Sequence, residues 1–112
     1  MNNFLISETV DFLKVLGDKT RLSILQLLED EEKSAAQLEE ELDKSQSTIS
    51  QHLSALKDAN LIDSEKEGRT NFYGIKNGQI FMILERIKSF LIRSKKEKLD
   101  SLEKIQINDI LF

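Results

Sequence analysis

The chain has 112 residues, which is the size of one small domain with a modest core, and it contains no cysteine. Without cysteine it can form no disulfide, no thiolate metal site and no thiol redox sensor. No apolar stretch reaches membrane-spanning length and no basic-then-apolar leader opens the chain, so we expect a soluble, cytoplasmic protein with no membrane partner.

The net charge of −4 is unevenly distributed along the chain. Residues 1–43 hold 4 basic and 11 acidic side chains, residues 44–76 hold 5 and 4, and residues 77–112 hold 7 and 5. The acidic side chains are therefore concentrated in the first part. An acidic body with a locally non-acidic face is compatible with nucleic-acid binding, but it predicts only moderate non-specific affinity.

The first part of the chain is predicted to contain two helices. Apolar side chains at helical spacing predict one helix over residues 3–16 and another over residues 19–29. Gly17 ends the first helix, and Asp18 is placed to cap the second. The acidic cluster at residues 29–32 is most simply a solvated loop.

A helix-turn-helix arrangement is predicted next. Ser34 and Gln37 form a capping-box pattern that opens a short third helix ending near Leu42. After a tight turn, Ser45 is placed to cap a fourth helix that runs to about Ala59. Two short helices, a tight turn and a further helix are the elements of a helix-turn-helix.

The remaining elements are a hairpin and a long helix. Two short runs, residues 61–66 and 71–76, flank a turn that contains Gly68 and predict a hairpin. Residues 79–104 show the apolar stripe of a long helix. The predicted fold is mainly α with a small β-hairpin wing, in the order α-α-α-α-β-β-α.

The fourth helix has an unusual outward face for so charged a chain. Between Ser45 and Lys57 it carries hydroxyls and amides and no acidic side chain, while Ile49, Leu53 and Leu56 fall on its buried side at 100° per residue. A solvated face would ordinarily carry Glu and Lys pairs. Double-stranded DNA both donates and accepts hydrogen bonds and fits this face, although a serine-rich face can also be neutral surface.

The direction of each side chain divides this face into two kinds of contact. Ser47, Gln51 and Ser54 point directly outward and are the base-edge candidates, and Gln51 is suited to a bidentate contact with adenine. Thr48 and Ser50, with the lysine at the helix end, are better placed for phosphates. The DNA-binding candidates of this helix are Ser45, Gln46, Ser47, Thr48, Ser50, Gln51, His52, Ser54 and Lys57.

His52 is the only histidine and lies beside the apolar stripe rather than opposite it. One interpretation is a half-buried histidine that packs and makes one hydrogen bond, and the other is a phosphate contact at the groove edge. We favour a mixture in which packing comes first. Because no second histidine or thiol is available to complete a site, we expect no metal and no cofactor.

The hairpin supplies two further DNA-binding candidates, Lys66 and Arg69. Arg69 lies beside Gly68 at the predicted tip, and an arginine on a flexible arm suits a narrow, electronegative minor groove. An ordinary charged turn is the simpler alternative. The position of this hairpin after a helix-turn-helix favours the wing of a winged helix.

The long helix has a wider apolar stripe than one small domain needs, and the first helix is also amphipathic. Both could complete a monomer core, but we expect a homodimer through the first and last helices, because two reading helices double the specific contacts. DNA binding and dimerisation are assigned to residues 1–104, and residues 105–112 form an apolar tail that either folds back or docks a partner. The candidate interface residues are Phe4, Leu5, Phe12, Ile80, Phe81, Leu84, Ile87, Phe90 and Leu91.

Several stretches resemble the ArsR/SmtB family of winged-helix repressors. Residues 16–25, LGDKTRLSIL, resemble the opening signature of that family, and residues 45–53, SQSTISQHL, resemble its recognition helix. Residues 56–62, LKDANLI, are similar to the stretch leading into the wing, and residues 67–69 match the wing pattern. The resemblance covers about residues 8–91.

The resemblance implies a homodimeric repressor that binds a palindromic operator and releases it when an effector binds. Many members sense metals through thiolates on the third helix, at positions matching residues 34–38, and others through histidines and carboxylates on the last helix. This chain has no thiol, and residues 79–98 contain no histidine. We therefore expect a regulator that departs from the metal-sensing pattern and that responds, if at all, to a small-molecule or protein effector.

Two other classes of function are weighed against DNA binding. A winged-helix protein-interaction module would use the acidic surface or the apolar tail. An enzyme is the weakest hypothesis, because the sequence contains no glycine-rich phosphate loop, nucleophile elbow or paired-histidine motif. We expect no catalytic residue.

Overall fold

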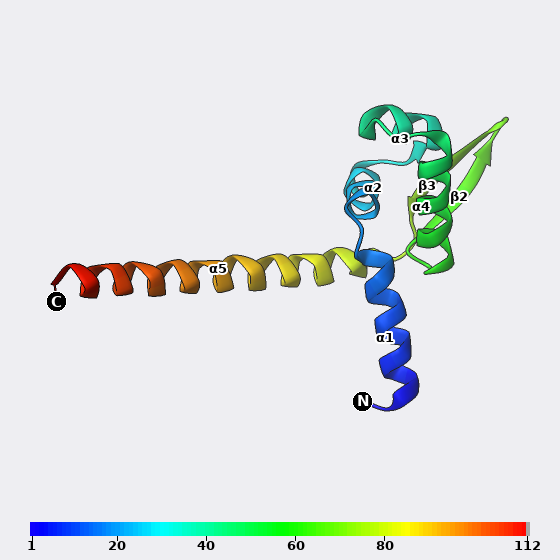
Figure 1. Ribbon diagram of the computed structural model, residues 1–112. Coiled ribbons are helices and arrows are strands. Elements are labelled where there is room, and N and C mark those ends of the chain that lie inside the picture. Colours follow the sequence, from blue (N-terminus) through cyan, green and yellow to red (C-terminus); the bar gives the residue numbers. More distant parts are fainter. Residues whose placement is uncertain (112) are drawn as a thin grey trace. The chain divides into compact units, whose positions relative to one another are not determined.

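The computed structural model describes residues 1–111, with side chains described for residues 1–104 (Figure 1). Two compact units divide the chain, Met1–Gly78 and Gln79–Phe112. The elements in chain order are α1 (Asn3–Leu16), α2 (Lys19–Asp30), β1 (Lys33–Ser34), α3 (Ala35–Leu42), α4 (Gln46–Asp58), β2 (Ile62–Glu67), β3 (Thr70–Ile75) and α5 (Gln79–Leu111). Among the described residues, none of these helices combines the length and apolarity needed to cross a membrane.

The predicted helices and hairpin are confirmed, and boundaries other than the end of the last helix differ by one residue at most. α5 runs to Leu111, beyond the predicted end at residue 104. The side chains of the predicted apolar tail, residues 105–112, lie outside the described residues. Its separation as a distinct segment stays a prediction.

Side-chain caps explain where the helices begin. Asp18 Oδ1 accepts a hydrogen bond from the Arg21 backbone N–H at 3.1 Å, which starts α2. Ser34 Oγ accepts from the Gln37 N–H at 3.2 Å, while Gln37 Oε1 accepts from the Ser34 N–H at 2.8 Å. This is the predicted capping box. Each cap satisfies a backbone donor that has no partner within the helix, which is worth about 1 kcal/mol.

The short strand β1 is an element that the sequence analysis did not predict. Lys33 and Ser34 pair with Tyr73 and Phe72 of β3, which gives a three-stranded antiparallel sheet in the order β1-β3-β2. Two residues are too short to show the alternation by which strands are recognised. The strand exists because a distant segment offers its backbone, and local sequence carries no sign of that pairing.

Lys33 is nearly buried and ties this strand to its neighbours. Its Nζ donates to Glu41 Oε1 at 3.1 Å and to Glu31 Oε1 at 3.2 Å. These two hydrogen bonds hold the pKa of Lys33 above its usual value, and the larger effect comes from Glu41. The predicted solvated acidic loop at residues 29–32 therefore also has a structural role, because Glu31 is a partner of a buried cation.

The tight turns on either side of α4 fix how it meets its neighbours. Asp43 adopts a left-handed conformation, with φ 53°, between α3 and α4. At the other end Asn60, with φ 62°, closes a Schellman motif in which the Leu61 N–H donates to Leu56 O at 3.1 Å. Because Leu61 is buried and β2 begins at the next residue, α4 leads directly into the hairpin.

The hairpin of β2 and β3 is paired from Ile62 opposite Ile75 to Glu67 opposite Thr70. Its two-residue turn begins at Gly68, whose φ of 63° suits the first central position of a type II′ hairpin turn. The largest fully buried side chains of the first unit come from four elements around this sheet: Ile24, Leu25, Leu38, Ile49, Leu56 and Ile62.

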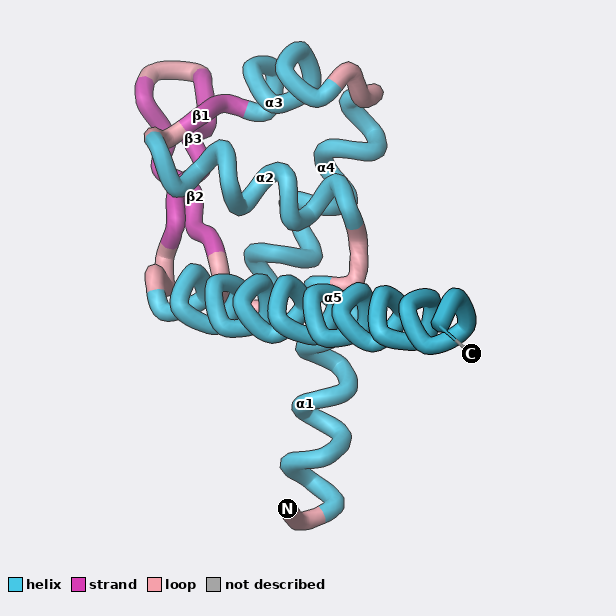
Figure 2. The backbone as a smooth tube through the Cα atoms, turned by 90° about the vertical axis from the view of Figure 1, so that its left-hand side faces the viewer, coloured by secondary structure: helices cyan, strands magenta, loops and turns pink. Residues whose placement is uncertain are grey.

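Figures 1 and 2 both show α2, α3 and α4 gathered beside the sheet, with α1 leading away from them. Leu16 is the buried residue of α1, whereas Phe4, Leu5, Ile6, Val10 and Leu13 of that helix are exposed apolar side chains. A helix-turn-helix followed by an antiparallel hairpin is a winged helix. The predicted fold class is thus confirmed, with β1 added to it.

Candidate DNA-binding surface

The buried and outward sides of α4 follow the predicted spacing. Ile49, Leu53 and Leu56 are buried and hold the helix on the core. The opposite face is open to solvent. From the start of the helix to Ser54 the exposed residues are Gln46, Ser47, Ser50, Gln51 and Ser54, and in the last turn Lys57 and Asp58 are exposed as well.

The first turn of α4 is organised by two hydroxyls. Ser45 Oγ accepts from the Thr48 N–H at 3.1 Å and donates to Thr48 Oγ1 at 2.9 Å. The Ser45 hydroxyl proton is therefore engaged within the protein. The half-buried Thr48 keeps its own hydroxyl proton free to donate outward, which suits a phosphate oxygen.

His52 is half-buried and turned toward α2. Its Nδ1 accepts a hydrogen bond from Arg21 Nε at 3.0 Å, and its Nε2 lies 3.8 Å from Asp18 Oδ1. An accepting Nδ1 assigns the proton of the neutral ring to Nε2. The packed histidine with one hydrogen bond is the arrangement found, and a phosphate contact by His52 stays a prediction.

Asp18 and Arg21 form the polar junction around His52. Arg21 Nη1 also donates to Val15 O at 3.2 Å. The hydrogen bond from the Arg21 backbone N–H is the main cause that holds the pKa of Asp18 below its usual value, and the Thr20 backbone N–H and the Arg21 charge act in the same direction. Sequence reasoning did not select Arg21 as a site residue. The only signal was a lone histidine beside an apolar stripe, which needs a partner but does not name one.

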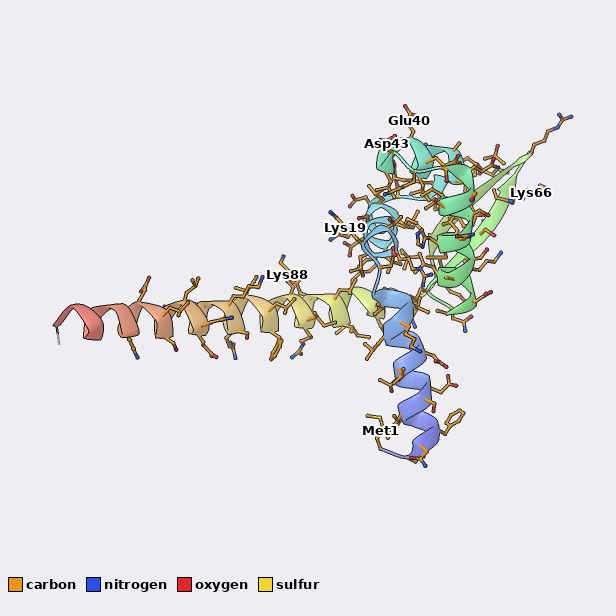
Figure 3. All side chains as sticks on the ribbon, in the orientation of Figure 1. Met1, Lys19, Glu40, Asp43, Lys66 and Lys88 are labelled. Carbon is orange, nitrogen blue, oxygen red and sulfur yellow. The ribbon has the colours of Figure 1, made fainter. Side chains whose placement is uncertain are left out.

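The remaining candidates lie at the end of α4 and on the hairpin. Lys57 Nζ, at the end of α4, donates to Ser64 Oγ of β2 at 2.9 Å. Lys66 on β2 and Arg69 in the turn are both exposed. In Figure 3, Lys66 extends from the hairpin, whereas the labelled acidic Glu40 lies on α3.

The candidates of α4 thus share one helix, and Lys57 connects that helix to the hairpin, which carries Lys66 and Arg69. A solvent-facing helix of hydrogen-bonding side chains, presented after a tight turn and followed by a basic hairpin, is the arrangement of a winged helix-turn-helix DNA-binding protein. Side chains of this helix are of the kind that reads base edges, and the hairpin has the place of the wing.

Comparison with known proteins identifies the family. Residues 18–64 match the arsR family of bacterial regulatory proteins. An uncharacterised HTH-type transcriptional regulator of Methanocaldococcus jannaschii is 38% identical over 81 residues, which cover 71% of this chain and 91% of that regulator. This chain belongs to the ArsR family, and it is a DNA-binding transcription regulator.

Two further relatives carry functional names. The transcriptional activator HlyU of Vibrio cholerae is 35% identical over 70% of this chain and 73% of HlyU. The structure of reduced HlyU superposes with a TM-score of 0.65, at 33% identity, over 75% of this chain and 88% of HlyU. An arsenical resistance operon repressor of Staphylococcus aureus is 34% identical over 71% of this chain and 77% of the repressor.

Proposed function

We propose that this chain is a repressor that binds an inverted-repeat operator as a homodimer. The observation that carries the proposal is the face of α4, where exposed hydroxyls and amides lie opposite the buried Ile49, Leu53 and Leu56. Residues such as serine lower the helix propensity of this segment, and on this face they add nothing to the core. Such residues are expected where the side chains bind another molecule.

Base reading is assigned to the exposed centre of that face. Ser47 and Gln51 lie in the N-terminal half of α4, which goes deepest into a major groove, and Ser54 lies further along the same side. Gln51 is the side chain able to form a bidentate pair with adenine, in which its amide N–H donates to N7 and its Oε1 accepts from the N6 amino group. Ser45, Gln46, Thr48, Ser50 and Lys57 are assigned to phosphates and the groove edge.

The wing is proposed to contact the minor groove or its phosphates. Arg69 occupies the turn beside Gly68, where its side chain is exposed and no neighbouring element packs on the turn glycine. Lys66 lies on the strand that leads to this turn. Both are cations on the hairpin that follows α4. A narrow minor groove attracts such cations.

Dimerisation is proposed to cover apolar side chains on α1 and α5. Phe4 is 73% exposed and Phe90 is 69% exposed, and each helix carries further exposed apolar side chains, as surfaces that take part in interactions do. Ile80 is 2% exposed within the single chain and can add little area, so it contributes least of the predicted set. The remaining predicted interface residues are exposed or half-buried: Leu5, Phe12, Phe81, Leu84, Ile87 and Leu91.

The proposed regulator does not sense metals through the known family sites. The chain has no cysteine to supply a thiolate. Its single histidine, His52, accepts from Arg21. Among the residues whose side chains are described, no three His, Asp or Glu gather to hold a metal ion. Release from the operator is assigned to a small-molecule or protein effector. Repression follows the S. aureus relative, whereas HlyU is named as an activator.

Stoichiometry on a duplex tests this proposal. In sedimentation velocity, we expect two chains per duplex that carries both halves of an inverted repeat, and far weaker binding to a duplex with one half. Equal affinity for the half-site, with one chain bound, would contradict the dimer. Absence of affinity for any duplex would instead favour the protein-interaction module.

A further inference from the structure

The side chain of Arg21 joins three helices of the first unit. Its Nη1 donates to Val15 O near the end of α1, at 3.2 Å, and its Nε donates to His52 Nδ1 on α4, at 3.0 Å. The same residue lies in the first turn of α2, where its backbone N–H is capped by Asp18. One partly buried guanidinium therefore links the recognition helix α4 to α1 and α2.

The link is made on α4 at the residue next to Gln51, a candidate for base reading. His52 follows Gln51 directly, and the two side chains diverge, with His52 turned inward and Gln51 exposed. A turn of α4 about its own axis would move the exposed face relative to a base pair. Functional side chains need to be held within about 0.5 Å and 10–20° to make their contacts.

We propose that Arg21 is a positioning residue of the recognition helix, acting through His52 Nδ1, so that specific duplex binding weakens when this hydrogen bond is lost. The inference rests on the proposed function of α4. It concerns how the reading face is held, and it assigns to Arg21 no contact with DNA.

The chemistry of the ring shows what the hydrogen bond requires. Nδ1 accepts from Arg21 Nε through its lone pair. A side chain at position 52 that offers no acceptor there leaves this N–H of Arg21 without its partner. Asp18, whose carboxylate lies 3.8 Å from Nε2, is the other charged group beside the ring.

Arg21→Lys tests the positioning role without removing the charge. A single ammonium cannot reproduce the fork that reaches Val15 O and His52 Nδ1 together. At neutral pH we expect affinity for a selected duplex to fall about fivefold, as for the loss of one hydrogen bond, with affinity for random duplex unchanged. Lys19→Gln on the same helix is the matched control, since it removes a positive charge and should leave the ratio of the two affinities as it was. An unchanged ratio in Arg21→Lys would overturn the proposal.

Variants of His52 separate positioning from general stability. His52→Asn places an acceptor near the position of Nδ1, so its ratio of selected to random affinity should stay close to that of the native chain. His52→Leu removes the acceptor, and its ratio should fall about fivefold. An unchanged ratio in the Leu variant, or an equal fall in both variants, would overturn the proposal. Circular dichroism verifies that both variants are folded.

These outcomes are distinct from failure of the proposed function. If the native chain at neutral pH binds selected and random duplexes equally, reading by α4 is itself wrong and Arg21 has nothing to position. If Arg21→Lys does not fold, the comparison of the native chain with His52→Asn and His52→Leu still decides the inference.

Discussion

Lys57 Nζ donates a hydrogen bond to Ser64 Oγ at 2.9 Å, which joins the last turn of α4 to the first strand of the wing. The Schellman motif closed by Asn60 joins the same two elements through the backbone. Two independent connections within a few residues make the helix and the hairpin one body. A duplex would therefore meet both at a fixed relative orientation.

Lys57→Ala should weaken binding to selected and random duplexes alike. The lysine is assigned to a phosphate, so its loss removes a contact that carries no sequence information. The slope of log affinity against log salt should become shallower by about 1. Fluorescence anisotropy at several salt concentrations measures both quantities.

Ser64→Ala is the matched control for this lysine. It removes the partner of Lys57 but leaves the positive charge, so the salt slope should stay unchanged. A slope that changes as much in Ser64→Ala as in Lys57→Ala would mean that the hydrogen bond, and not the charge, is what the duplex depends on.

Gln51→Ala should relax base preference at one position of each half-site. Loss of a bidentate contact removes about 1–3 kcal/mol of discrimination against the wrong base. Affinity for random duplex should stay the same, because phosphate contacts are untouched. Competition with single-base variants of a selected duplex measures this. Gln26→Ala, at an exposed position on α2, should change neither quantity, and retention of full base preference in Gln51→Ala would remove Gln51 from the reading face.

Gly68→Ala should destabilise the chain by about 1 kcal/mol. The φ of 63° at this turn is unfavourable for any residue with a Cβ, although the surrounding space is open. Gly78→Ala also meets open space and has no positive φ, so it should be neutral or slightly stabilising. Urea denaturation of the two variants compares them, and equal effects would contradict a backbone origin.

Asp18→Ala should cost about 1 kcal/mol of stability at neutral pH through loss of the α2 cap. Because the pKa of Asp18 is held below its ordinary 3.8, ionised Asp18 stabilises the fold above that value. The contribution is lost as pH falls through the lowered pKa of the folded state. Asp18→Asn keeps a capping oxygen, so its unfolding free energy should approach that of the native chain in acid. A constant difference from pH 7 to pH 2 would contradict this account.

The local part of the structure could be predicted from sequence, and the non-local part could not. The helical spacing of apolar residues and the capping residue predict where α4 lies and that Ile49 is buried while Gln51 is exposed. Spacing and capping both depend on residues only a few positions apart. The pairing of β1 with β3 depends on segments far apart in the sequence, and it was missed. The same holds for the bond from Arg21 to His52, which only the packing of α2 against α4 creates.

Selection of bound sequences from a random duplex library, read at two salt concentrations, tests the central claim most directly. The account predicts an inverted repeat with half-sites about one helical turn apart, and affinity for it that falls steeply with salt. Recovery of sequences with no shared motif, bound no more tightly than the starting library at moderate salt, would contradict sequence-specific reading by α4.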